Sequence, residues 1–404
     1  MPADLGAGQT YSSRPKVVSR PQRAADATQR TVWRRALHRP FIIGQHPGWV
    51  GVSRSRLASA LIVGLVVGLA LTSCSTAIPA ASPGSGPATS AAPRKAAARP
   101  AAPALVSLPS PGSALPSPAA LVPFAADRGR GAGAWTPAGR AVGGGPAVYE
   151  TTLIPPGGTQ PAGIAWMDTG LLSARLYSGS VSPGGGPYRY TAPVMPAQAR
   201  TLVAAFNGGF KMNDAHGGYY TEGRMIDPLR PGAASMVIYA DGAMDLGAWG
   251  SDVTMTPQVA SVRQNLTPLV AGGRPTVRAA SANWQQWGST CAATSCGHGI
   301  PGVEHQWRSG LGIVADGALI YAADPDLGPL QLAQLLVRAG AVRGMELDIN
   351  PAWPVFATYD PPLGALAAPS NGRKLLSSTT PGPATFFEAS WARDFVTMSA
   401  RPVR

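Results

Sequence analysis

Charged side chains are scarce in this 404-residue chain, at 13% of its composition, whereas glycine and proline together exceed a fifth of it. The formal net charge is nevertheless +13, which by itself suggests a nucleic-acid partner. The excess is local: residues 1–100 contain 13 Lys and Arg and two Asp, which leaves 20 basic and 18 acidic side chains in the other residues. A nearly neutral remainder lacks the clustered cations that bind a phosphate backbone. The sequence therefore predicts no nucleic-acid partner.

The chain also lacks an apolar run as long as a membrane-spanning helix, which needs about 20 residues. The run from Leu57 to Leu71 is shorter, follows Arg54 and Arg56, and leads into Thr-Ser-Cys74. A basic flank, a short apolar core and small residues are typical of a secretion signal. The ending resembles a bacterial lipoprotein signal, in which Cys74 becomes the lipid-bearing first residue. An uncleaved signal anchor is the alternative, and both place the following chain outside the cytoplasm, anchored to the membrane.

Cysteine and histidine are rare, with three and five residues. If Cys74 carries lipid, Cys291 and Cys296 remain as a pair, for which we expect a disulfide. No further Cys or His pair completes a zinc site and no HExxH spacing occurs, so no metal site and no cofactor is predicted. His298, close to the cysteine pair, leaves a divalent cation open. Signatures of a P-loop, a dinucleotide-binding fold and a GxSxG nucleophile elbow are also missing.

Aromatic residues are missing from residues 75–123, which are mostly Ala, Pro, Ser and Gly. Such a composition buries too little apolar surface to offset the entropy lost on ordering, so we expect an extended tether over residues 75–134. Residues 1–53 are interpreted as a basic, disordered extension, which is not translated if the start codon lies near Val52. Residues 54–74 form the signal or anchor. The folded domain is then expected over residues 135–404.

Within that domain the pattern is mostly that of strands. Asp241-Gly242 and Asp316-Gly317 supply the residues that two-residue hairpin turns prefer, so they predict two hairpins. One helix is expected from Pro329 to Ala339, because it opens on proline and is followed by Gly340. Many strands with one clear helix predict an α+β fold with a mixed, largely antiparallel sheet. The expected strands are 149–154, 162–168, 171–179, 201–206, the two hairpins over 234–247 and 311–323, and 342–350.

The first polar cluster follows the apolar strand 201–206. Asn207-Gly208-Gly209 directly ends this strand, and paired glycines allow either a sharp turn or close approach of a ligand to the backbone. His216 and Glu222 belong to the dense polar stretch that comes next. A solvated glycine loop is the alternative interpretation.

Two further clusters lie near the expected helix. Arg308 enters an apolar strand, where its planar guanidinium could bind a phosphate or carboxylate, or could face solvent at the strand edge. On the strand 342–350, alternation places Glu346, Asp348 and Asn350 on one face. Two carboxylates spaced i, i+2 are close enough for their titrations to interact. An ordinary half-exposed strand is the alternative.

In this order, the clusters resemble the phosphodiester glycosidase family. That family has an NGGFF-like turn after a strand, an Arg before a glycine-punctuated hairpin, a helix, and a strand that ends in LDGGGS. The corresponding segments here are FNGGF (206–210), WRSGLGIVADGALIYA (307–322), GPLQLAQLLVRAGA (328–341) and MELDINPAW (345–353). The chain departs from the family after Asp348, where Ile-Asn-Pro-Ala-Trp353 replaces the glycine run.

The resemblance implies hydrolysis at the anomeric carbon of a sugar 1-phosphodiester, with an envelope glycan or sugar phosphate as the substrate. Acid–base catalysis is assigned to Asp348 together with Glu346 or Glu222, and binding of the phosphate group is assigned to Arg308. The residues expected to hold the substrate are Asn207, Gly208, Gly209, Arg308, Asn350 and His216.

A glycan-binding envelope domain without catalytic activity is the second hypothesis, because the family's glycine run is missing. In that case Trp307, Trp353 and the NWQQW segment (283–287) would stack on sugars. A binder retains polymer without releasing reducing sugar, whereas an enzyme releases it. A metal-dependent hydrolase is a third hypothesis, and the sequence offers no ligand set for it.

Overall fold

The computed structural model describes residues 105–125, 132–282, 284–288 and 304–402. The signal run, Cys74, the Cys291–Cys296 pair and His298 fall outside these ranges, so lipidation, the disulfide and the cation remain predictions. Among the described residues, no helix combines the length and apolar character that crossing a bilayer requires.

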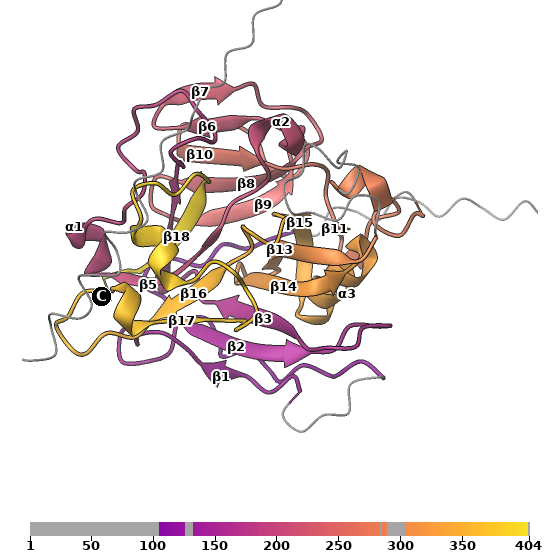
Figure 1. Cartoon of the computed structure of the whole chain (residues 1–404), viewed down its shortest axis with the longest axis horizontal. Coiled ribbons are helices and arrows are strands. Elements are labelled where there is room, and N and C mark those ends of the chain that lie inside the picture. Colours follow the sequence, from indigo (N-terminus) through magenta and orange to yellow (C-terminus); the bar gives the residue numbers. More distant parts are fainter. Residues whose placement is uncertain (1–104, 126–131, 283, 289–303, 403–404) are drawn as a thin grey trace, which may run out of the picture. The chain divides into compact units, whose positions relative to one another are not determined.

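Three β-sheets form the framework of the described chain (Figure 1). All pairings between named strands in the described ranges are antiparallel, which confirms the predicted α+β class with its largely antiparallel sheet. The first sheet has the order β1 (Thr136–Pro137), β2 (Val148–Leu153), β3 (Ala162–Met167), β14 (Leu319–Leu327), β13 (Gln306–Val314), β15 (Ala341–Glu346), β11 (Val270–Ala271) and β12 (Arg274–Pro275).

The other two sheets have five strands each. The second has the order β7 (Arg224–Asp227), β6 (Tyr219–Thr221), β10 (Val259–Gln264), β8 (Ala234–Tyr239) and β9 (Met244–Ala248). The third has the order β17 (Gly372–Lys374), β16 (Phe356–Tyr359), β5 (Leu202–Asn207), β18 (Phe395–Ala400) and β4 (Leu172–Tyr177). The described helical segments are α1 (Pro196–Ala199), α2 (Met212–Ala215), α3 (Pro329–Arg338) and the 3-10 turns η1 (Trp284–Trp287), η2 (Pro369–Asn371) and η3 (Pro383–Phe387).

Both predicted hairpins are present. Gly242 and Gly317 adopt φ of +80° and +90° at the turns of β8–β9 and β13–β14, a conformation that glycine reaches without steric cost. Helix α3 follows β14 and leads into β15, as expected. The strand predicted over 342–350 is shorter than expected, because β15 ends at Glu346.

The main hydrophobic core receives side chains from all three sheets, among them Leu311 of the first, Met236 of the second and Phe206 of the third. A second core forms where the apolar face of α3, including Leu332 and Leu336, packs on the first sheet. Segments distant in the sequence are therefore brought together around β5, β13 and β15.

Residues 105–125, called the strap below, were expected to belong to an extended tether. That expectation is wrong for these residues, because the strap packs on the domain. The backbone N–H of Leu115 donates to an oxygen of Asp168 at 2.9 Å, and the guanidinium of Arg338 lies 4.2 Å from the ring centre of Phe124. The few apolar side chains of the strap pack against the two hydrophobic cores. The composition of the segment does not reveal these contacts.

Candidate active site

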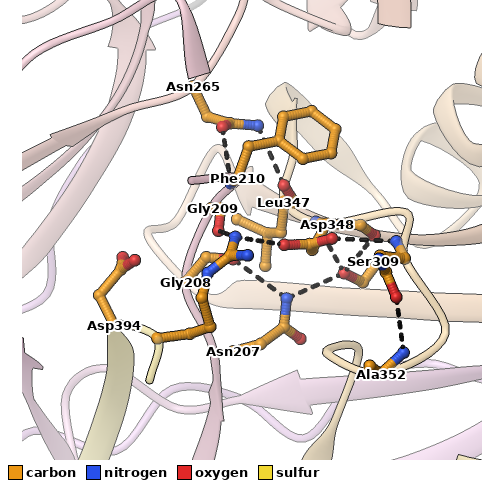
Figure 2. A network of polar contacts seen from close by, with 12 residues as sticks. Asn207, Gly208, Gly209, Phe210, Asn265, Ser309, Leu347, Asp348, Ala352 and Asp394 are labelled. Carbon is orange, nitrogen blue, oxygen red and sulfur yellow. Dashed lines mark hydrogen bonds and ion pairs between the residues drawn. The ribbon is translucent and has the colours of Figure 1, made fainter. Parts of the chain in front are cut away.

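Asn207 ends β5 and connects the third sheet to the first. Its Oδ1 accepts hydrogen bonds from the Tyr321 hydroxyl at 2.8 Å and from the Val355 N–H at 3.1 Å. Its Nδ2 donates to the Ser309 hydroxyl at 3.1 Å and to the Gly208 carbonyl at 3.0 Å (Figure 2). These bonds use both donors and both lone pairs of the amide. Asn207 therefore positions the surrounding strands, and it has no hydrogen-bonding capacity left for a sugar in this geometry.

The glycines after Asn207 allow close packing against charged side chains. A Cβ at Gly208 would lie 2.1 Å from Oδ2 of Asp394, and a Cβ at Gly209 would lie 2.8 Å from the guanidinium carbon of Arg263. Arg263 and Asp394 form a buried ion pair of 2.8 Å. The space beside the glycines, which was predicted to admit a ligand close to the backbone, is thus filled here by the protein's own side chains.

Asn265, on the chain just after β10, links this glycine turn to the end of β15. Its Oδ1 accepts the N–H of Phe210 at 3.0 Å, while its Nδ2 donates to the carbonyls of Glu346 and Leu347 at 2.8 and 3.0 Å (Figure 2). Asn265 therefore ties the glycine turn to the backbone of Glu346 and Leu347, next to Asp348. Sequence reasoning missed Asn265, which follows Arg263 and Gln264 and belongs to no recognised motif.

Arg308 and Glu346 form a fully buried ion pair, with 2.6 Å between Nη1 and Oε1. Arg308 Nε also donates to the carbonyl of Leu327, Nη1 to that of Trp287, and Nη2 to that of Glu304, all at 2.7–3.0 Å. All three guanidinium nitrogens are engaged and none of the side chain is exposed. The assignment of Arg308 to phosphate binding thus finds no support in this geometry, which gives Arg308 the structural role of holding Glu346 in place.

Glu346 is a carboxyl group suited to carry a proton near neutral pH. Burial raises the pKa of Glu346 to about 7, against the opposing effect of Arg308. The charge of Asp348 contributes a smaller increase in the same direction. Oε2 of Glu346 is buried and has no hydrogen-bond partner among the described residues, so it can bear the proton.

Asp348 lies two residues beyond β15, where the strand alternation no longer applies. Its Oδ2 lies 2.6 Å from Nη2 of Arg393, and its Oδ1 accepts the N–H of Asn350 at 3.0 Å. Its backbone N–H donates to the hydroxyl of Ser309 at 3.1 Å (Figure 2). Burial raises the pKa of Asp348, while Arg393 lowers it. The two carboxylates thus differ: Glu346 has an unpartnered oxygen, whereas both oxygens of Asp348 are held.

Arg393 was missed at the sequence level, and it comes from the segment that precedes β18. The guanidinium carbon lies 4.9 Å from the ring centre of Trp353, and the rings of Trp353 and Trp391 are 5.2 Å apart in an edge-on arrangement. Both tryptophans are half-buried. An Arg-Asp pair immediately before an apolar strand was the available signal, in a chain where charges are scarce.

Arg308, Glu346, Asp348 and Arg393 are called the carboxylate cluster below. The structure does not bring Glu222 into it. Glu222 lies at the β6–β7 turn, is exposed, and accepts the backbone N–H groups of residues 189 and 190 at 3.0 and 2.9 Å.

Glu222 lines a separate cavity of about 110 Å³ together with Arg175 and Tyr190. His216 ends α2 in the left-handed conformation and is exposed. Neither side chain makes a hydrogen bond or ion pair to the carboxylate cluster in the described structure. Within the described ranges, no three His, Cys, Asp or Glu side chains gather as a metal-ligand set.

No protein-family model and no curated protein matches the chain. Solved structures do. One is the catalytic domain of zebrafish N-acetylglucosamine-1-phosphodiester alpha-N-acetylglucosaminidase, auto-inhibited by its pro-peptide, with 15% identity, a TM-score of 0.37 and coverage of 66% of this chain and 87% of that one. Another is a hypothetical protein from Synechocystis, with 11% identity, a TM-score of 0.33 and coverage of 66% and 64%. The relationship is a distant one of fold.

Proposed function

We propose that this domain is an extracytoplasmic hydrolase that cleaves the glycosidic bond of a sugar 1-phosphodiester in an envelope glycan or a related glycoconjugate. The observation that carries the proposal is the pair of buried carboxyl groups, Glu346 and Asp348, at one end of β15. They occupy the place where the sequence resembles the catalytic motif of phosphodiester glycosidases. The zebrafish glycosidase domain named above acts on the same kind of bond according to its name.

The two environments suit different parts of the reaction. Asp348, held next to Arg393, is the carboxylate that accepts a proton from water as the water oxygen attacks the anomeric carbon. The bond between that carbon and the phosphate oxygen breaks, and the phosphate leaves with the bonding electrons. Glu346, whose pKa is raised to about 7, supplies a proton to the leaving side. Asn207 and Ser309 position Asp348 rather than contact the substrate.

The test is hydrolysis of a GlcNAc 1-phosphodiester by the purified chain and by Asp348→Asn. The substitution keeps the size of the side chain but removes the base, so release of reducing sugar should fall by about 100-fold or more, because general base catalysis contributes about 10²–10⁴-fold. Asp245→Asn is the matched control, since Asp245 forms a different Asp–Arg pair with Arg343 at 3.3 Å. Unchanged hydrolysis in a folded Asp348→Asn protein would remove this carboxylate from the mechanism.

The second candidate is a glycan-binding domain without activity. It is favoured by one observation: the half-buried Trp353 and Trp391 stand beside the carboxylate cluster. Trp287 of the NWQQW segment is 1% exposed and belongs to a hydrophobic core, so it cannot stack on a sugar there. Retention of envelope polymer without release of reducing sugar would favour the binder.

We also propose that the chain is held at the membrane from outside the cytoplasm through its N-terminal region. The support is the basic flank, apolar run and Cys74 in the sequence. Cys74→Ser should release the protein from the membrane fraction if Cys74 carries lipid. The variant should stay in that fraction if the run is an uncleaved anchor, and this result would contradict the lipid interpretation. A wild-type protein recovered outside the membrane fraction would contradict both anchors.

A further inference from the structure

Three buried arginines lie at the glycine turn or in the carboxylate cluster, namely Arg263, Arg308 and Arg393, and they differ in how many of their donors are used. Arg263 donates from Nε to Asp394, from Nη1 to the carbonyl of Gln264, and from Nη2 to the carbonyl of Phe210. Arg308 likewise engages every nitrogen. Each of these two guanidinium groups uses four of its five N–H donors, as expected of buried structural charges.

Arg393 is different. Its Nη2 donates to Asp348 at 2.6 Å and to the carbonyl of Gly209 at 2.8 Å. Its Nε is buried without a hydrogen-bond partner, and its Nη1 makes no hydrogen bond to any described residue. Three of the five N–H donors of this guanidinium are therefore free. Leaving a buried charged donor unpaired is costly, so the Nε–H of Arg393, together with the Nη1 donors beside it, is available to an acceptor from outside the chain.

The surroundings of Arg393 hold its planar guanidinium in one orientation. The ring of Trp353 lies against it at 4.9 Å and is itself packed edge-on with Trp391. About 5% of the Arg393 side chain is exposed, whereas Arg308 has no exposed surface. A planar cation held in place by a carboxylate and an aromatic ring is pre-organised for an oxyanion such as a phosphate.

The position of Arg393 also solves an electrostatic problem. A phosphodiester carries a negative charge and would repel an ionised Asp348 in a poorly solvated site. A guanidinium shared between them offsets this repulsion, so that the carboxylate stays ionised while the anion is bound. Lysine could supply the charge but not the several donors in one plane.

We propose that Arg393 is the residue that binds the phosphodiester anion and makes the site select sugar 1-phosphodiesters over uncharged glycosides. The selectivity part of this inference rests on the proposed function and is tested by kinetics. The anion-binding part is tested by phosphate binding, which is independent of catalysis. It replaces the sequence-based assignment of this role to Arg308.

The kinetic test compares Arg393→Lys with the wild type on two substrates, a GlcNAc 1-phosphodiester and an uncharged aryl α-GlcNAc glycoside. Lysine keeps a cation beside Asp348 but loses the fork, so kcat/KM for the phosphodiester should fall about 10- to 100-fold more than kcat/KM for the glycoside, mainly through KM, as expected for a lost charge-assisted hydrogen bond. Arg343→Lys, at the separate ion pair with Asp245, should change neither value. An equal loss on both substrates would give Arg393 a structural role only and overturn the proposal.

The binding test is titration of the full chain with inorganic phosphate by calorimetry. The wild type and Arg343→Lys should bind phosphate, and Arg393→Lys should bind it at least about 10-fold more weakly. Far-UV circular dichroism establishes that the variants are folded. If the chain hydrolyses no sugar phosphodiester yet binds phosphate through Arg393, the proposed function fails and the anion site stands. If the wild type binds no phosphate, or the folded Arg393→Lys binds it equally well, the anion site is refuted.

Discussion

The substitution Gly208→Ala distinguishes two reasons for the glycine pair after β5. If the glycines admit a ligand, alanine should impair activity and leave stability unchanged. If they admit the buried Arg263–Asp394 pair, alanine should destabilise the fold. The structure favours the second reason, because an added Cβ would lie 2.1 Å from Oδ2, 2.7 Å from Cγ and 2.9 Å from the carbonyl oxygen of Asp394.

The size of the effect follows from what must move. Ordinary contact between such atoms is about 3.5–4 Å, so either the carboxylate or the β5 backbone must shift by roughly 1 Å or more. The carboxylate is completely buried and lies 2.8 Å from Arg263, while the Gly208 N–H is bonded to the Asp394 carbonyl at 2.9 Å. Separating a buried ion pair costs about 3–5 kcal/mol, and overpacking alone about 1–3 kcal/mol. We expect Gly208→Ala to lower the free energy of unfolding by about 3–5 kcal/mol.

Urea unfolding followed by tryptophan fluorescence measures this change as a lower midpoint. Gly145→Ala is the matched control, because a Cβ there meets nothing within 4 Å and the residue does not have a positive φ. Its unfolding free energy should stay within about 0.5 kcal/mol of the wild type. A Gly208→Ala protein with wild-type stability would refute the packing argument, and loss of hydrolysis at that stability would restore the ligand explanation.

Three further predictions concern other parts of the fold. A chain that lacks residues 1–125 should melt at a lower temperature than a chain that lacks residues 1–104, because the strap is lost; equal melting of the two truncations would contradict the packing of the strap. Because the pKa of Glu346 is raised to about 7 in the folded state from 4.5, its contribution to stability is complete below about pH 4.5 and is lost as the pH rises through 7, by up to about 3 kcal/mol. Urea titrations across this range should show that Glu346→Gln flattens the slope of the unfolding free energy against pH. An unchanged slope would show that a group other than Glu346 takes up the proton. Tyr321→Phe should cost about 0.5–1.5 kcal/mol in the same assay, because Asn207 loses one of its four hydrogen bonds, and a neutral result would deny the tyrosine that role.

Much of the local structure could be predicted from the sequence. Asp-Gly turns between apolar runs require positive φ and indicated both hairpins, while proline before an amphipathic run and glycine after it indicated α3. The extent of the β15 strand was predicted less well. Alternation continues in the sequence through residue 350, but the chain leaves the ladder after Glu346, where backbone bonds to Ser309 replace the regular pairing.

The packing of the strap could not be predicted from the sequence. Its composition is that of a linker, and local patterns contain no information about a surface to which a proline-rich segment can bind. Leu115, Leu121 and Phe124 nevertheless pack against the core shared by α3 and the first sheet. A few apolar residues are enough when the folded domain supplies their partners, and such long-range contacts cannot be read from periodicity.

The sequence by itself determined where the positive charge lies, which turns and helix form, and which few polar residues stand out in a charge-poor domain. Only the tertiary structure decided how those residues are paired. It joins Arg308 to Glu346, Arg393 to Asp348, and Asp394 to the glycine turn, across 38, 45 and more than 180 residues of chain. The physical reason is that ion pairing and burial depend on how separate sheets pack, whereas sequence patterns report only neighbours along the chain. The +13 of the whole chain thus describes its N-terminal region, and three buried arginines organise the candidate site.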